Sequence, residues 1–496
     1  MEDRIEAAYL RCYKEKERKA DALYEALRQL IVGGTVREGE RLPSSRKLAE
    51  RLGMSRGSVN QAYDMLYSEG FVSAERGSGT FAAYRQPMLE TASLAEETAI
   101  PLSAWARRLA ADASFASATA GGREPFEGID MNSGDIDPSV FPLEEWKTAM
   151  YGQIRSIFEE SGQDGDSALG HLPLREAIAN ELRRERGISV SADHICVTSG
   201  SMYALALLTM VLIDPGDRVV FENPGYGGIR RAITAAGGLP ISAEIDQRGI
   251  RPEPWEAKLL FVTPGRQFPT GVLLPSERRT RLLEWASRQN AVIVEDDYDS
   301  EFRWGGRPSE PLKALDREGR VIYVGTFSKT MYQSLRLGYL VVPDALREPI
   351  RRAKLLLEPH PSSLAEQRAL AAFMASGGYS RHLRRMRRLY GRRMLRFREE
   401  AESRLSGLFT FMPTDAGLHQ YAEWRGSLPD YERLRTACRE SGVRWGSALP
   451  YWAEGDRDER AVRSATFGFA HLSESTITEA VRRIEECWSR LGKANE

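Results

Sequence analysis

The chain has 496 residues, of which 42% are hydrophobic and 28% charged, and its formal net charge is -1. This length allows two or three cores of ordinary size, and this composition excludes a disordered or collagen-like protein. The longest apolar stretch, 204–213, is about half of what a membrane span requires, and the charged start lacks the apolar stretch of a secretory signal. We therefore expect a cytoplasmic protein without a membrane partner.

Charge is not spread evenly along the chain. Five basic residues between positions 41 and 58 stand against a single acidic residue, Glu50. They are Arg41, Arg46, Lys47, Arg51 and Arg56. A local excess of positive charge in a nearly neutral protein permits one region to bind nucleic acid. The four cysteines, in contrast, are too widely separated to predict a disulfide framework or a metal site.

The first predicted elements form a helix-turn-helix. Apolar residues recur at helical spacing over 21–31, and Gly33 ends that helix. Ser44 or Ser45 can cap a second helix, and Ser55 can cap a third after a tight turn. The inward-facing residues are Leu48, Ala49 and Leu52 in the second helix and Val59, Ala62, Tyr63 and Leu66 in the third.

Two short strands, 70–72 and 77–81, are predicted to flank a tip at Glu75 and Arg76 and to form a wing. A recognition helix presents polar side chains from its first turns to the major groove, so DNA contacts are expected there and on the wing. The candidate DNA-binding residues are Arg46, Ser55, Arg56, Ser58, Asn60 and Arg76. Each arginine alone is equally typical of a solvated surface, but the order of the whole segment favours DNA binding.

Three blocks of this segment follow the pattern of the GntR-type winged helix. They are Leu42-Pro43-Ser44-Ser45-Arg46-Lys47-Leu48-Ala49, Ser55-Arg56-Gly57-Ser58-Val59 and Gly77-Ser78-Gly79-Thr80-Phe81. Residues 17–84 therefore resemble a GntR-type DNA-binding domain, and this resemblance implies a double-stranded DNA operator as partner.

The polar, aperiodic stretch 85–100 is predicted to be a linker, and 101–496 a second domain. In that domain helical periods alternate with short, almost continuously apolar segments. This alternation predicts an α/β fold whose mainly parallel sheet is covered by helices. The predicted strands are 194–198, 218–221, 259–262, 291–294 and 321–324.

Candidate residues for a pyridoxal 5'-phosphate (PLP) site follow several of these strands. PLP requires an amine, an acid beside its pyridine nitrogen, a stacking partner and a phosphate cradle. Lys329 is the candidate amine for a Schiff base, and Asp296 is the candidate acid, with Asp297 as the fallback. Tyr298 could donate to the ring hydroxyl, and Tyr226 could stack on the ring.

The candidate phosphate cradle combines a helix start with hydroxyl and guanidinium groups. Gly200 and Ser201 lie between a predicted strand and an apolar helix, where backbone N–H groups and the positive helix end converge. Thr326, Ser328 and Arg336 would complete the cradle, and Arg336 would form bidentate bonds. These positions are ends of parallel strands, where ligands of such folds bind.

The order of these motifs resembles that of fold-type I aminotransferases. With the winged helix included, nearly the whole chain resembles the MocR/GabR family of transcriptional regulators. Further matching segments are 174–179, 214–217, 267–271, 295–302 and 335–340. This resemblance implies a homodimer, PLP bound to Lys329, and DNA binding that responds to a small-molecule effector such as an amine, an amino acid or PLP itself.

The chain departs from these patterns in several places. The enzymes usually have Asn at the position of Phe268, and the regulators commonly have Ser-His where this chain has Gly265 and Arg266. Both aminotransferases and GabR bind a carboxylate through an arginine at the position of Thr466. Because threonine cannot replace a guanidinium, either Arg463 reaches into the site or the effector is not held by a carboxylate.

Three functional hypotheses follow. The first is a PLP-dependent transcriptional regulator whose aminotransferase-like domain senses an effector and has at most weak transaminase activity. The alternative is a PLP-dependent aminotransferase with an appended DNA-binding head. The third is a DNA-binding protein that uses an empty transferase fold only for dimerisation, which predicts no bound chromophore.

Overall fold

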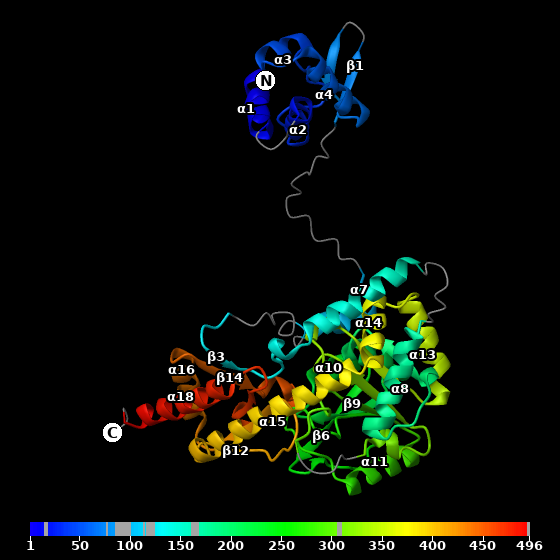
Figure 1. Ribbon diagram of the computed structural model, residues 1–496, viewed down its shortest axis with the longest axis vertical. Helices are drawn as coiled ribbons and strands as arrows, with labels where there is room; N and C mark the ends of the chain where they lie inside the picture. The colour runs from blue at the N-terminus through cyan, green and yellow to red at the C-terminus, as the bar shows by residue number, and fades with distance from the viewer. Residues whose placement is uncertain are drawn as a thin grey trace. The chain divides into compact units, whose positions relative to one another are not determined.

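The computed structural model divides into two compact units, Met1–Pro101 and Leu102–Glu496 (Figure 1). The structure describes residues 1–13, 18–75, 78–84, 101–112, 115, 125–159, 168–304 and 310–493. The predicted linker, 85–100, lies outside these described residues. Each unit is therefore described by itself.

The first unit is built around the predicted helix-turn-helix. Its helices are α1 (Glu2–Tyr13), α2 (Lys19–Val32), α3 (Ser45–Arg51) and α4 (Arg56–Ser68). Ser44 caps α3 by accepting from the Lys47 N–H at 3.4 Å, and Ser55 caps α4 by accepting from the Ser58 N–H at 3.1 Å. The inward faces predicted for α3 and α4 pack in one core with α1 and α2. The sequence did not reveal α1.

The wing is a two-stranded antiparallel sheet. Strand β1 (Val72–Glu75) pairs with β2 (Gly79–Ala82), with Val72 opposite Ala82 and Glu75 opposite Gly79. The predicted wing-tip contact, Arg76, lies outside the described residues.

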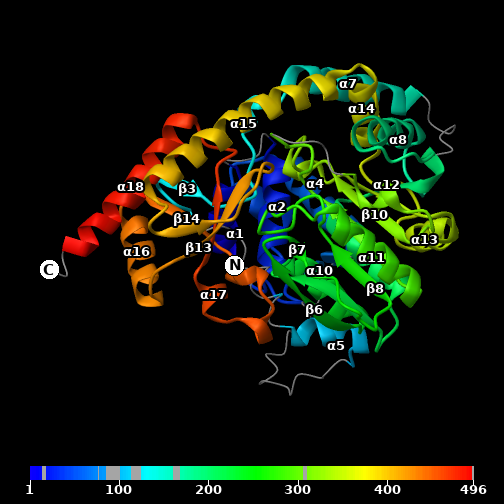
Figure 2. The ribbon, with the colours of Figure 1, turned by 90° about the horizontal axis from the view of Figure 1, so that it is seen from below.

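The second unit contains an eight-stranded, mainly parallel sheet, as predicted (Figure 2). The strand order is β4 (Ile195–Thr198), β11 (Gly338–Val341), β10 (Val321–Thr326), β9 (Val292–Asp297), β8 (Leu259–Val262), β5 (Arg218–Asn223), β6 (Leu239–Asp246) and β7 (Gly249–Ile250). Strands β10, β9, β8, β5 and β6 are parallel neighbours, whereas β11 and β7 pair antiparallel. All five predicted strands are present.

Helices cover both faces of this sheet, because its strands are apolar on both sides. One core includes residues of α9 (Ser201–Leu212), α10 (Gly227–Ala236) and α13 (Asp344–Leu357). The opposite face packs against α8 (Leu172–Arg186) and α14 (Leu364–Ala375), and α11 (Ser276–Gln289) covers β8 and β9. The carboxyl ends of the parallel strands therefore lie together along one edge of the sheet.

A second, five-stranded sheet lies toward the C-terminus. Its order is β12 (Phe409–Phe411), β13 (His419–Trp424), β15 (Ser464–Gly468), β14 (Val443–Ser447) and β3 (Ile129–Met131). Helices α15 (Gly378–Arg404), α16 (Leu428–Glu440) and α18 (Glu474–Lys493) pack on one face, and α15 also contacts α14 of the larger sheet (Figures 1 and 2). We call this part the C-terminal sheet.

Within the described ranges, no helix has the length and apolarity that crossing a membrane requires. The same residues contain no cluster of three or more His, Cys, Asp or Glu side chains suited to a metal ion. All four cysteines are buried, and none of them forms a disulfide bond.

Candidate functional site

The candidate DNA-binding residues of the first unit lie on the outer side of the helix-turn-helix. Arg46, Arg56 and Asn60 are exposed. The Nε of Arg56 donates to Ser45 Oγ at 3.2 Å, so this arginine is oriented across the turn between α3 and α4. Ser55 uses its hydroxyl as the cap of α4, which leaves the first N–H groups of that helix at the surface.

Helix α1 changes the charge of the predicted basic region. Lys47 Nζ lies 2.6 Å from Glu2, and Arg51 pairs with Glu2, Asp3 and Glu6. Two of the five basic residues counted there are thus compensated by acidic residues about 45 positions away. The positive charge of this segment is therefore partly neutralised in the folded unit, and Arg46 and Arg56 remain exposed.

In the second unit, strand register brings the predicted cofactor residues to one edge. Thr198 on β4 pairs with Gly338 on β11, and Gly338 pairs with Thr326 on β10. Gly325 in turn lies opposite Asp297 on β9. The loops that follow β4, β10 and β9 therefore emerge side by side, although the first is about a hundred residues or more from the other two in the chain.

Gly200, Ser201 and Arg336 meet at this edge. A Cβ on Gly200 would lie 3.0 Å from Nη2 of Arg336, and a Cβ on Gly338 would lie 3.0 Å from the Ser201 N–H nitrogen. Gly200 has φ +88°, a conformation that favours glycine. The guanidinium of Arg336 thus lies against the N-terminus of α9, and glycines at positions 200 and 338 keep this approach free of side chains.

Hydroxyl groups border the same place. Ser328 Oγ accepts from Thr326 Oγ1 at 3.0 Å, and the Ser328 N–H donates to Thr326 Oγ1 at 3.2 Å. Nη2 of Arg336 lies 3.4 Å from the Ser199 carbonyl oxygen, a long hydrogen bond that leaves most of its donors available. Together these groups form a cluster of hydrogen-bond donors suited to an anion.

The two adjacent aspartates at the end of β9 differ in their surroundings. Successive residues of a strand point to opposite faces. Asp297 is bound by Arg186, by the Tyr323 hydroxyl at 2.5 Å and by the Ser300 N–H at 3.2 Å. Asp296 is 7% exposed, and its Oδ1 is buried without a hydrogen-bond partner among the described residues.

These surroundings shift the pKa values of Asp296 and Asp297 in opposite directions. Burial raises the pKa of Asp296 to about 7, and the neighbouring carboxylates of Asp297 and Asp299 contribute to this rise. Burial also opposes ionisation of Asp297, but the Arg186 guanidinium and the hydrogen bonds to Ser300 and Tyr323 lower its pKa below the usual value. No cationic side chain of the described residues pairs with Asp296, so it is the better candidate acid.

Lys329 and a cluster of aromatic rings complete the edge. Lys329 Nζ donates to the Gly134 carbonyl oxygen at 2.6 Å. The Phe268 ring lies 6.1 Å from Tyr226, 5.4 Å from Tyr298 and 4.8 Å from Tyr451, measured between ring centroids. Phe268, at the position where the enzymes have Asn, therefore adds an apolar wall rather than a hydrogen bond.

Sequence reasoning missed a buried polar network beneath Tyr298. Arg266 is 2% exposed, and its Nη1 donates to the Tyr298 hydroxyl at 2.8 Å and to Asp299 at 2.9 Å. His419 accepts through its carbonyl from the same guanidinium at 2.7 Å. The only signal in the sequence was the unusual Gly265-Arg266 pair before Gln267.

Neither Thr466 nor Arg463 supplies a carboxylate anchor in this structure. Thr466 is 1% exposed on β15, and its Oγ1 has no hydrogen-bond partner among the described residues. The guanidinium of Arg463 instead donates to the Gly426 carbonyl at 2.9 Å and pairs with Glu459 at 3.0 Å. Of the two sequence-based alternatives, an Arg463 that reaches into the site is therefore not the one observed.

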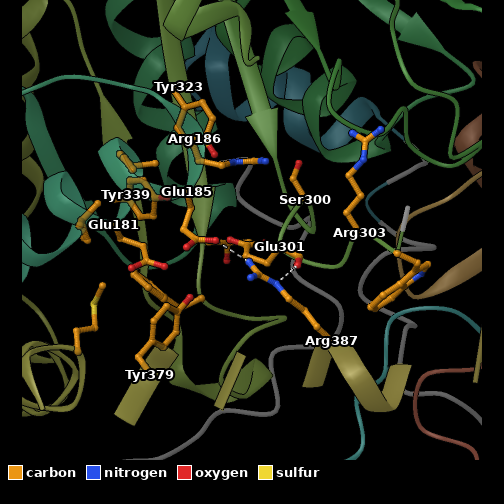
Figure 3. Close-up of a pocket in the computed structure, with 16 residues that line it drawn as sticks. Glu181, Glu185, Arg186, Ser300, Glu301, Arg303, Tyr323, Tyr339, Tyr379 and Arg387 are labelled. Carbon is orange, nitrogen blue, oxygen red and sulfur yellow. Dashed lines mark hydrogen bonds and ion pairs between the residues drawn. The ribbon is translucent and has the colours of Figure 1, made fainter. Parts of the chain in front are cut away.

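A cavity of about 290 Å³ lies near the same strand ends (Figure 3). Its lining includes Tyr323 and Arg186, the partners of Asp297. Arg387 donates to Glu185 at 3.0 Å and to the Glu301 carbonyl at 2.7 Å, so charged groups of the lining bind one another (Figure 3). The cavity is on the side of β9 that Asp297 occupies, whereas the preceding residue, Asp296, points to the other side.

Comparisons with known proteins match the two units of the chain to two different families. Residues 19–82 match the bacterial regulatory proteins of the GntR family, and residues 127–484 match the aminotransferases of class I and II. Among solved structures, kynurenine aminotransferase from Pyrococcus horikoshii superposes with a TM-score of 0.68 at 26% identity, covering 79% of this chain and 97% of that one. The second unit therefore has the fold of these aminotransferases.

Relatives with both parts are transcriptional regulators. The probable rhizopine catabolism regulatory protein MocR of Rhizobium meliloti is 35% identical over 95% of this chain and 93% of its own length. The pyridoxine biosynthesis regulator PdxR of Corynebacterium glutamicum is 32% identical over 94% of this chain and 95% of its own. The chain therefore belongs to the MocR-type family of HTH-type transcriptional regulators, in which a GntR-family head is joined to an aminotransferase-like domain.

Proposed function

We propose that this protein is a PLP-dependent transcriptional regulator, with a DNA-binding head at 17–84, a linker at 85–100 and a sensing domain at 101–496. The observation that carries the proposal is the buried Oδ1 of Asp296, which has no hydrogen-bond partner among the described residues and lies at the same sheet edge as Lys329 and Arg336. A buried carboxyl without a partner is costly, and a protonated pyridine nitrogen is the cationic group that would satisfy it.

The other residues at the edge fit the remaining parts of PLP. Gly200 and Gly338 leave open the approach to the N-terminus of α9, where the Ser201 N–H and Arg336 would bind the phosphate with Thr326 and Ser328. When bound, PLP supplies an aldehyde that reacts with primary amines and a ring that withdraws electrons.

Specific roles follow for the residues around the ring. Lys329 would hold the cofactor through its amine, and Asp296 would keep the pyridine nitrogen protonated. Tyr226 would cover the ring, with Tyr298 donating to the ring hydroxyl. Phe268 closes the space between the two tyrosines and excludes water from this side.

The effector class follows from the opposite end of the site. Thr466 offers a hydroxyl where a guanidinium would fix a substrate carboxylate, so a bound amino acid would be poorly oriented for proton transfer. We therefore expect at most weak transaminase activity and an effector that is an amine, an amino acid or PLP itself. The names of MocR and PdxR, which refer to rhizopine catabolism and pyridoxine biosynthesis, point to the same range of ligands.

We also propose that the protein acts as a homodimer in the cytoplasm. Leu355, Leu356 and Leu357 at the end of α13 are 42%, 81% and 45% exposed. Three consecutive exposed leucines on the second unit are more than a monomer usually leaves in water. Sedimentation equilibrium of the full chain would test this state, with Leu356→Glu expected to weaken the dimer.

The decisive experiment measures operator binding with and without PLP, together with the absorbance of the bound cofactor. A tenfold change in DNA affinity corresponds to about 1.4 kcal/mol of coupling. We expect PLP or a candidate amine to change DNA affinity in the wild type and not in Lys329→Ala. Rapid transamination of a common amino acid with 2-oxoglutarate would instead favour the aminotransferase, and absence of any bound chromophore would favour a dimerisation scaffold.

The head offers a matched pair of arginines for the DNA test. Arg56 is exposed beside the cap of α4, whereas Arg51 is bound by three acidic side chains of α1. Arg56→Ala should weaken operator binding and reduce its salt dependence. Arg51→Ala should weaken it less, and equal losses from both variants would contradict the assigned surface.

A further inference from the structure

Arg266 is a fully enclosed guanidinium at the junction of the two sheets of the second unit. It lies in the loop between β8 and α11, and it is 2% exposed. Three of its partners come from elsewhere in the chain. They are the Tyr298 hydroxyl at 2.8 Å, the Asp299 carboxylate at 2.9 Å and the His419 carbonyl at 2.7 Å. Arg266 thus joins the end of β9 to the first residue of β13.

The surrounding chain is shaped to admit this side chain. Arg266 Nε donates to the Ala416 carbonyl at 3.1 Å, one residue before Gly417. A Cβ at Gly417 would overlap Nε and Cζ of Arg266, and Gly417 has φ +89°. A side chain at that position would therefore displace the guanidinium and strain the backbone.

Arg266 also determines what the Tyr298 hydroxyl can do. A phenol has a single proton to donate, and its oxygen here already accepts from Arg266. Burial raises the pKa of Tyr298 well above its ordinary range, although the Arg266 guanidinium opposes this effect. The phenol therefore keeps its proton, and the Arg266 bond occupies one side of the oxygen, so that proton must point elsewhere.

His419 is fixed by the same network. Its Nε2 lies 3.0 Å from the Pro269 carbonyl and must donate to it, which leaves Nδ1 as an acceptor 3.5 Å from Arg266 Nη1. Burial lowers the pKa of His419 well below its ordinary value, and the Arg266 charge adds to this effect. Because a neutral His419 does not repel the Arg266 guanidinium, Arg266 can remain close to β13.

We propose that Arg266 is a positioning residue that directs the Tyr298 hydroxyl toward the ring of PLP and couples that ring to strand β13 of the C-terminal sheet. This inference rests on the proposed function, since it requires PLP to lie against Tyr298. A shift of the C-terminal sheet on effector binding would move the carbonyls of Ala416 and His419 and thereby change how Tyr298 meets the cofactor.

A double-mutant cycle tests this role, because an effect transmitted through Tyr298 must vanish when the phenol hydroxyl is absent. Arg266→Lys keeps the charge beside Asp299 but removes the planar fork. We expect Arg266→Lys to weaken PLP binding by about tenfold, measured by equilibrium dialysis, and to shift the absorbance maximum of bound PLP. In the Tyr298→Phe background, Arg266→Lys should change neither quantity further.

Arg278 provides the matched control. It is 8% exposed and binds Asp246 at 2.7 Å and the Gly249 carbonyl at 2.8 Å, which is the same chemistry as Arg266 without any contact to Tyr298. Arg278→Lys should lower thermal stability while leaving the PLP dissociation constant and the spectrum unchanged. If Arg266 had only a structural role, Arg266→Lys would likewise lower thermal stability and leave the PLP dissociation constant and the spectrum unchanged.

The outcomes separate this inference from the proposed function. If the wild-type protein binds PLP, and Arg266→Lys alters affinity equally in the Tyr298 and Tyr298→Phe backgrounds, the coupling through Tyr298 is refuted. No effect of Arg266→Lys on affinity or spectrum refutes it as well. If the wild type itself binds no PLP, the proposed function fails first.

Discussion

The strand-end edge of the large sheet and the C-terminal sheet face the same candidate site, but they differ in charge. At the edge, Asp296, Lys329 and Arg336 supply an acid, an amine and a guanidinium. On the C-terminal sheet, Thr466 stands where the sequence resemblance leads us to expect the carboxylate-binding arginine of aminotransferases, and Arg463 is bound to Glu459 and Gly426.

This difference separates two tasks that an aminotransferase performs together. Holding a cofactor requires only the groups at the edge, whereas turning over an amino acid also requires that its Cα–H bond be oriented. A chain that keeps the first set and lacks the second can still bind PLP and respond to a ligand. The difference between the edge and the C-terminal sheet therefore favours a sensor over an enzyme, and substitutions on either side test it.

The largest effect is expected at the edge, from Lys329→Ala. Removing the amine should abolish the visible absorbance of bound PLP, because no other lysine is assigned to reach the aldehyde. The apo protein should unfold at the temperature of the wild type. Lys258→Ala, which removes an exposed lysine 2.7 Å from Asp217, serves as the control. A cofactor band that persists in Lys329→Ala would place the attachment on another lysine and contradict the role assigned to this edge.

A smaller but more specific effect is expected from the two aspartates of β9. Asp296→Asn should weaken PLP binding by roughly 10- to 100-fold, since it removes a charged hydrogen bond to the ring. Asp297→Asn leaves Arg186 without its buried partner and should lower the free energy of unfolding by about 3 kcal/mol or more.

Dialysis against PLP and denaturant unfolding of both variants separate these effects. The assignment of Asp296 predicts that its variant changes ligand affinity more than stability, and that the Asp297 variant does the reverse. If instead Asp296→Asn mainly lowers stability and Asp297→Asn mainly lowers PLP affinity, Asp297 is the acid beside the ring.

The sequence predicted a mainly parallel sheet, Ser55 as the cap of α4, Ser44 or Ser45 as the cap of α3, and the position of the acidic pair at a strand end. These features depend on local periodicity and on short-range hydrogen bonds, which a sequence displays directly. The choice between Asp296 and Asp297 depended on which face of β9 carried Arg186, a residue more than a hundred positions away. Local patterns contain no such information.

The ion pairs of Arg51 and the hydrogen bonds of Arg266 could not be predicted from the sequence, for the same reason. Arg51 looked like a free cation because its partners Glu2 and Glu6 lie in a helix that the predicted boundary of the head excluded. Arg266 looked like a departure from a motif because its carbonyl partners, Ala416 and His419, are 150 residues away or more. Tertiary contacts that join distant segments decide these ion pairs and hydrogen bonds.

The pH dependence of stability offers a milder test of the edge. Burial raises the pKa of Asp296 to about 7, and it raises those of Glu295 and Glu222 to about 7 and about 8. Each carboxyl binds its proton more tightly in the folded than in the unfolded apo protein. These three groups therefore lower the free energy of unfolding as the pH rises from about 4 to about 7, by at most about 1.4 kcal/mol per pH unit for each group.

Asp296→Asn and added PLP should both reduce the dependence of the free energy of unfolding on pH. The substitution removes one of the three carboxyls, and PLP gives the Asp296 carboxylate a cationic partner. Urea unfolding at several pH values measures the slope. A slope in the apo wild type equal to that of Asp296→Asn would contradict a buried, neutral Asp296.

The smallest effect is expected on the C-terminal sheet, from Thr466→Arg. A Cβ on Gly446 would lie 2.5 Å from Thr466 Oγ1, so the glycine leaves room for the threonine hydroxyl. An arginine here would restore a guanidinium to the carboxylate end of the site. We expect it to lower, by about tenfold or less, the concentration of amino acid that half-changes the absorbance of bound PLP.

Thr466→Val is the matched control, because it removes the buried hydroxyl at nearly constant volume and adds no charge. It should leave amino acid binding unchanged and tests whether packing alone produces the effect. If Thr466→Arg also raises transamination with 2-oxoglutarate, the missing guanidinium is what separates this sensor from an enzyme. If neither affinity nor turnover responds, the carboxylate end of the site lies elsewhere, and the contrast between the two sheets does not bear on transaminase activity.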